Sequence, residues 1–162
     1  MQAAAIVVMC VLAACGYGII HDQITARICI EYFTVGHPPI FARPVTSPTV
    51  IGFAWGIIAT WWVGVGLGIP LAIAARAGKR TKRSVRDLIR PIAVLLGIMA
   101  VLALLAGIVG ALLASAGWVT LRGPLAESVP ADNHVAFLAD AFAHSISYLA
   151  GAVGGLVIIA RT

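Results

Sequence analysis

The chain has 162 residues, of which 61% are hydrophobic and 10% are charged, and its formal net charge is +5. Soluble domains are typically about 45–50% apolar, so this composition, with a mean hydropathy of +1.03, excludes an ordinary soluble fold. Most basic residues gather in one segment instead of covering a soluble face, which excludes a nucleic-acid-binding protein. The length indicates one membrane domain over residues 1–162.

Four long apolar segments follow one another along the chain. A helix needs about 20 residues, each rising about 1.5 Å, to cross a hydrocarbon core roughly 30 Å thick. Since a bilayer leaves backbone groups unpaired outside helices and closed barrels, and the segments lack alternating polarity, we expect helices. The sequence predicts an all-α fold, an integral membrane four-helix bundle, with spans at about 3–20, 49–75, 91–119 and 134–160.

The first segment allows two interpretations. It is free of charge up to Ile20, and we expect its helix to continue to about Thr34, because the GHPP run at 36–39 ends any helix. Alternatively, the LAAC run ending at Cys15 fits a lipoprotein cleavage box, which would leave three spans. The MQAAA start lacks the positive n-region of a signal peptide, which favours the first interpretation.

Ionisable residues are concentrated directly after this segment. On a helix, successive residues are about 100° apart, which puts His21 and Glu31 on one broad face and turns Asp22 away from it. Arg27 and Glu31 are spaced i to i+4, where side chains meet, so we expect them to form a structural pair.

A basic segment, Arg76–Arg90, separates the second and third spans and holds most of the chain's eleven basic residues. Short basic loops remain in the cytoplasm, so we expect both termini to be cytoplasmic as well. This topology fits a multi-pass protein of the cell membrane, such as a bacterial inner membrane. The same cations would contact anionic lipid heads, or would serve only as a topology signal.

The fourth span carries two polar residues, Asp140 and His144, which are spaced i to i+4. An ionisable residue inside the bilayer costs about 2.5–3.5 kcal/mol on insertion scales, so Asp140 should face the bundle interior and have a partner there. His144, His21 and Arg27 are the candidate partners.

Histidines and acidic residues therefore gather at the face opposite the basic loop. Imidazole and carboxylate groups are ligands for Zn, Mn or Fe, and helical bundles place such sites between facing helices. The predicted metal ligands are His21, Glu31, Asp140 and His144, with Asp22 and His134 as further candidates. Such a site would serve a membrane-embedded enzyme. Three alternatives stay open: a proton or ion pathway, a small transporter or channel component, and a structural subunit whose polar residues only pair helices.

Three pairs of small residues are spaced i to i+4 within the spans. Small residues at this spacing let helix backbones approach closely. The pairs predict tight packing, either within one bundle or between copies in a homo-oligomer. They are Gly64/Gly68, Gly107/Ala111 and Gly151/Gly155.

The block HDQITARICIEYFTVGHP, which begins at His21, resembles a run in other proteins. Small uncharacterised bacterial four-span membrane proteins share such a DQ-T-R-EYFT-HP pattern. The resemblance covers about 20 of the 162 residues. It implies no particular fold or activity and assigns no functional residue, but it does imply that this segment is more than a random loop.

Overall fold

The computed structural model of this protein describes residues 1–78 and 81–162. Lys79 and Arg80, which belong to the predicted basic loop, lie outside the described residues. Within the described chain every regular element is a helix, which confirms the all-α prediction. Four helices or helix pairs are long and apolar enough to cross a membrane: Gln2–Ile28, Pro48–Arg76, Val85–Ser115 and Ala131–Arg161. This indicates a multi-pass membrane protein.

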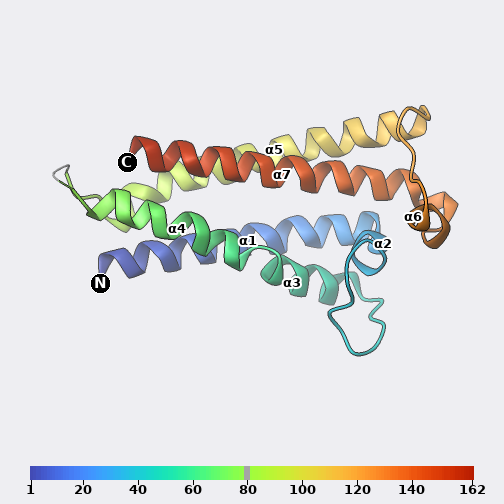
Figure 1. The fold of residues 1–162 in the computed structure, drawn as a ribbon, viewed down its shortest axis with the longest axis horizontal. Coiled ribbons are helices and arrows are strands. Elements are labelled where there is room, and N and C mark those ends of the chain that lie inside the picture. Colours follow the sequence, from blue (N-terminus) through green and yellow to red (C-terminus); the bar gives the residue numbers. More distant parts are fainter. Residues whose placement is uncertain (79–80) are drawn as a thin grey trace.

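The helices run along one common axis and leave the bundle with two distinct ends (Figure 1). Both termini lie at one end, together with the connection between α4 (Trp61–Arg76) and α5 (Val85–Ser115). We call this the basic end. The opposite end, which we call the loop end, carries the short helices α2 (Ile30–Thr34) and α6 (Pro124–Ser128). Both termini and the basic connection therefore share one end, as the predicted topology requires.

The first helix does not continue unbroken to Thr34. Helix α1 (Gln2–Ile28) ends at Cys29, whose backbone is extended with φ −147° and ψ 101°, and the five-residue α2 begins after it. The break changes the direction of the chain. Glu31 therefore does not continue the helical face of His21, on which its prediction as a ligand depended.

The second span consists of two helices, α3 (Pro48–Ile58) and α4, with a break at Ala59 and Thr60. The break frees the carbonyl of Ala59 from the helical hydrogen-bond pattern. The hydroxyl of Tyr148, from α7 (His134–Arg161), donates to this carbonyl over 3.3 Å. A partner for such a carbonyl is needed, because unpaired backbone groups are costly in a membrane.

Helix α5 begins earlier than the predicted third span. Ser84 and Asp87 form a capping box, so the helix starts at Val85 instead of Pro91. It also ends before the predicted position, at Ser115. Gly117 follows with a φ of +74°, a conformation that favours glycine and stops helices. The predicted loop therefore shortens, and Arg86 and Arg90 lie on the first turns of α5.

The α1 helix packs tightly against α3 and α4 through a stripe of glycines, which we call the glycine seam. It consists of Gly52, Gly56, Gly64 and Gly68. A Cβ added to Gly56 would lie 2.5 Å from the Cα of Ile19, and one added to Gly52 would lie 2.7 Å from the carbonyl oxygen of Asp22. Only glycine permits this approach, so the seam fixes the α1 backbone directly behind Asp22.

The α5 and α7 helices form the second tightly packed pair (Figure 1). Gly110 allows close packing, since a Cβ there would lie 2.8 Å from the ring carbon Cγ of Phe142. A further glycine, Gly151, lies against Met99 in the same chain. Fewer residues join α1 to α7, and the buried polar residues lie between these two pairs.

Candidate metal centre

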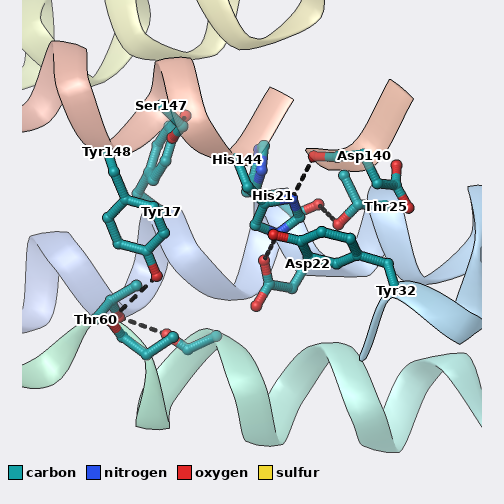
Figure 2. A network of polar contacts seen from close by, with 12 residues as sticks. Tyr17, His21, Asp22, Thr25, Tyr32, Thr60, Asp140, His144, Ser147 and Tyr148 are labelled. Carbon is teal, nitrogen blue, oxygen red and sulfur yellow. Dashed lines mark hydrogen bonds and ion pairs between the residues drawn. The ribbon is translucent and has the colours of Figure 1, made fainter. Parts of the chain in front are cut away.

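Two helices bring three metal-ligating residues together between the pairs. His21 and Asp22 come from α1, and His144 comes from α7 (Figure 2). One possible ligand atom from each residue lies within 4.8 Å of the other two. Asp22 and His144 are buried, with 5% and 7% of their surfaces exposed. The sequence predicted His21 and His144 as ligands and named Asp22 only as a further candidate.

The His144 ring is held in one orientation by contacts on both of its nitrogens. Its Nδ1–H donates to the carbonyl oxygen of Asp140, one turn earlier, over 2.8 Å. This leaves Nε2 facing a carboxylate oxygen of Asp22 at 3.2 Å. The Tyr32 ring stacks on the imidazole with centroids 4.4 Å apart. The backbone bond and the aromatic stack together fix the nitrogen that points at Asp22.

His21 is positioned by residues on its own helix. The Tyr17 ring stacks on it at 5.7 Å, and the two planes are only 12° apart. Thr25 donates from its hydroxyl to the His21 carbonyl over 3.1 Å, which is a common use of threonine in helices. The His21 ring then meets the His144 ring edge-on, with centroids 4.5 Å apart. The stripe Tyr17–His21–Thr25 thus presents an imidazole to α7.

Two buried polar side-chain atoms, one in this group and one on α7, have no hydrogen-bond partner among the residues that the structure describes. They are Nε2 of His21 and Oδ2 of Asp140, and Asp140 is only 1% exposed. A buried polar atom without a partner costs about 1–3 kcal/mol, so its persistence in a native structure calls for a partner that binds there. The prediction that Asp140 faces the bundle interior agrees with its burial.

Three of the predicted ligands lie outside the group of His21, Asp22 and His144. Asp140 contributes its backbone carbonyl, which accepts from His144, and its carboxylate is not one of the grouped ligand atoms. Glu31 accepts a 2.9 Å hydrogen bond from the amide of Asn133 and a contact from the thiol of Cys29. The ring nitrogen Nε2 of His134 donates to the carbonyl of Val129 over 3.0 Å. Glu31 and His134 form their hydrogen bonds at the loop end instead of joining His21 and His144. Glu31 lies away from His21 because the break at Cys29 ends the helical face that carries His21.

The predicted pair between Arg27 and Glu31 does not form either. The Arg27 guanidinium donates to the side-chain oxygen of Gln23 over 2.7 Å and to the hydroxyl of Thr49 over 2.8 Å. The i to i+4 spacing requires one continuous helix, and the extended backbone at Cys29 interrupts it between the two residues. Arg27 therefore ties α1 to the start of α3.

The residues at the break are held in their uncharged forms. Burial, with the charges of Glu31 and Asp140 adding to it, raises the pKa of the Cys29 thiol to about 12. Burial also raises the pKa of the Tyr32 phenol above its usual range. Since a metal binds the thiolate and not the thiol, Cys29 is a poor ligand compared with the imidazoles.

A cavity of about 120 Å³ lies in the interior beside the three residues. Its polar wall includes Tyr17 and Ser147, whose hydroxyls form a 2.7 Å hydrogen bond. Toward the basic end its walls are apolar and include Leu71 and Ile158. The polar chemistry is therefore confined to one part of the cavity, next to His21, Asp22 and His144.

The sequence did not indicate the aromatic enclosure of His144. Tyr32 and Phe33 lie directly after a helix break that no proline or glycine marks, so their approach to α7 depends on the fold. The Gly52/Gly56 pair, in contrast, has the i to i+4 spacing that indicates a close helix contact, although it is not one of the three predicted pairs.

Comparison with protein-family models, with curated proteins and with solved structures finds no match for this chain. Its function is therefore argued from the geometry of the centre.

Proposed function

We propose that this protein binds one divalent transition metal ion through His21, Asp22 and His144, as a membrane-embedded metalloenzyme. One observation carries the proposal: two imidazoles and a carboxylate from two different helices converge to within 4.8 Å, and Asp22 and His144 are buried. Asp140 supports the site through its backbone carbonyl, which accepts from the His144 ring and so orients this ligand.

The spacing of the atoms supports a shared ion. Ligand atoms about 2.0–2.2 Å from one metal, at tetrahedral or octahedral angles, lie roughly 3 Å from each other. The 3.2 Å between Nε2 of His144 and Oδ1 of Asp22 matches this separation. Histidines that bind metal also donate their other ring N–H to a carbonyl or carboxylate, as His144 does to Asp140.

The ligand set narrows the choice of metal. Two histidines and one carboxylate suit Zn, Mn or Fe(II), and three protein ligands leave at least one coordination position open. An open position is typical of catalytic sites, whereas structural zinc sites fill all four. This supports an enzyme over a purely structural metal site.

The transporter and channel alternative requires a polar path to the basic end. Among the described residues that line the cavity on that side, none carries a carboxylate, imidazole or basic group, and Leu95 and Ile159 are typical of them. This arrangement favours a binding site with one polar region over a relay across the bundle.

We extend the proposal to topology, with the basic end in the cytoplasm and the metal centre in the outer half of a cell membrane. The cations near Arg86 would then lie at anionic lipid heads. Thr46 and Thr81 are both exposed, so they give a matched pair for cysteine labelling. In intact cells an impermeant reagent should label Thr46→Cys and miss Thr81→Cys, with the native cysteines replaced. The opposite pattern would invert the topology.

The metal proposal is tested by elemental analysis of the protein purified in detergent. After incubation with Zn, Mn or Fe(II) and removal of free metal, we expect one ion per chain. His144→Ala should lose nearly all of it, because this change removes the most rigidly held ligand. His134→Ala is the matched control, since the His134 ring donates to the Val129 carbonyl at the loop end and does not belong to the centre.

Two outcomes would contradict the proposal. The first is a folded wild-type protein that retains none of the three metals. The second is equal metal loss in His134→Ala and His144→Ala, which would place binding outside the centre. In the first case the structural alternative stands, and His144 and Asp22 only hold α1 to α7.

A further inference from the structure

A second and larger hollow, an elongated groove of about 770 Å³, reaches the same centre from the side of the bundle. It lies between α1, α5 and α7. Along α1 it extends from Leu12 to Ile28, which corresponds to about 24 Å of helix. His21 and Asp140 are the only residues of its described lining with an imidazole or carboxylate group.

Small residues create this groove. Gly16 on α1 and Gly97 on α5 both line it, and a Cβ added to either would meet no atom within 4 Å. Alanines make up half of the remaining lining residues on α5 and α7. They are Ala100, Ala103, Ala111, Ala139 and Ala143.

The groove opens toward the lipid. The large apolar residues along it are exposed on the bundle surface: Ile20 is 67% exposed and Leu104 is 65% exposed. Both belong to helices long and apolar enough to cross a membrane, so these exposed faces meet acyl chains. A molecule dissolved in the bilayer would reach the centre along this groove without leaving the membrane.

The two atoms without partners belong to residues of this groove. Nε2 of His21 and Oδ2 of Asp140 are both buried and unpaired, and both residues line the groove. A ligand that supplies a hydrogen-bond donor or acceptor there would remove the cost of leaving these atoms unpaired.

We propose that the groove binds a single-chain amphiphile with an uncharged hydroxyl or carbonyl head, which enters sideways from the bilayer. The tail lies along the apolar wall, and the head meets His21 and Asp140 beside the metal centre. That this amphiphile is the substrate rests on the proposed metalloenzyme, whereas its binding does not.

Three features select this occupant. The described lining of the groove holds no Lys or Arg, so it offers no partner for a phosphate or sulfate head. Its volume lies within the roughly 300–1,000 Å³ of small-molecule sites. A helix from a second copy would cover the apolar walls, but an apolar helix would leave His21 and Asp140 without polar partners.

The experiment uses a hexadecanol analogue that carries a photoreactive diazirine and an alkyne handle. It is crosslinked to the full-length protein in nanodiscs, with unlabelled hexadecanol as competitor. We expect labelled peptides from α1, α5 or α7, and labelling should fall about tenfold in Gly97→Leu, equivalent to about 1.4 kcal/mol. Gly66→Leu is the matched control, since Gly66 also has open space around its Cβ but does not line the groove.

A second variant tests the head group. Asp140→Leu removes the unpaired carboxylate and should weaken competition by hexadecanol more than competition by hexadecane. Metal content is measured on every sample. Groove labelling without bound metal would refute the metalloenzyme proposal and support amphiphile binding. Bound metal without groove labelling would support the metal centre and refute amphiphile binding.

Other results would overturn the inference. Equal labelling in Gly97→Leu and Gly66→Leu would place the alcohol elsewhere on the lipid surface. Efficient disulfide crosslinking between copies through Gly97→Cys would show that a second copy occupies the groove. Tighter competition by hexadecyl phosphate than by hexadecanol would contradict the uncharged head.

Discussion

The α1 helix meets its neighbours along two seams that are built in opposite ways. On one side the glycine seam lets α3 and α4 approach until backbone touches backbone, as at Gly56 and Ile19. On the other side α1 faces α7 through a polar seam, which consists of His21, Asp22, Asp140 and His144, with a cavity and a lipid-facing groove beside it. One helix therefore takes part in both the tightest and the most open packing of the bundle.

The difference shows how a membrane bundle can hold reactive groups in place. Without a hydrophobic driving force between helices, close van der Waals packing must fix α1, and the glycine seam supplies it. The fixed backbone then presents His21 and Asp22 to α7 without requiring tight packing there. The open seam leaves room for a ligand, so rigidity and access lie on opposite faces of the same helix.

Breaking the polar seam should have the largest effect on stability. In metal-free protein Asp22→Ala leaves His144 without the partner that now lies at 3.2 Å. Leaving a buried polar group without its partner costs about 1–3 kcal/mol, and more when the group is charged, so we expect the free energy of unfolding to fall by about 3 kcal/mol or more. Titration of the purified protein with SDS, in the presence of a chelator, measures it.

The exposed Asp132, outside the centre, is the control for this change. Asp132→Ala should unfold like the wild type. If the two alanine variants unfold at the same SDS fraction, the contact between Asp22 and His144 contributes nothing to holding α1 and α7 together. The polar seam would then contribute to ligand binding but not to the stability of the bundle.

A smaller loss is expected from the glycine seam, where an added side chain meets the α1 backbone but no buried polar group loses its partner. Gly56→Leu places a side chain where even a Cβ would lie 2.5 Å from the Ile19 Cα. Overpacking costs about 1–3 kcal/mol, occasionally more, and we expect the upper part of this range. Gly66→Leu adds the same side chain on α4 where nothing lies within 4 Å, and it should leave the melting temperature in detergent unchanged. Equal melting of the two variants would show that the seam is not tight.

The fold was largely predictable because hydropathy and charge determine it. Four apolar segments of spanning length and one basic connection required four helices with both termini at one end. The depth of Asp140 and its spacing from His144 likewise predicted a buried polar site between the first and last spans. These inferences depend on composition and periodicity, which the sequence displays directly.

The composition of the site was less predictable, because it depends on where one helix ends. The helical wheel turned Asp22 away from His21, yet α7 approaches between the two residues and contacts both. The same wheel put Glu31 on the face of His21, but the break at Cys29 separates Glu31 from His21. No glycine or proline marks this break, and the packing of Tyr32 and Phe33 against the His144 ring follows it.

The smallest effect is expected next to the polar seam, at the hydrogen bond between Tyr17 and Ser147. Tyr17→Phe keeps the ring that stacks on His21 and removes only the hydroxyl that lies 2.7 Å from Ser147. A hydrogen bond of this kind contributes about 0.5–1.5 kcal/mol, so we expect a loss near 1 kcal/mol and no change in metal content. Ser147→Ala should cost a similar amount, and the double variant should cost little more than either single change, because both remove one bond. Strictly additive losses would show that the two hydroxyls do not interact. The contact between Asp22 and His144 would then be what holds the polar seam together. The glycine seam differs, because close contacts at several glycines hold it.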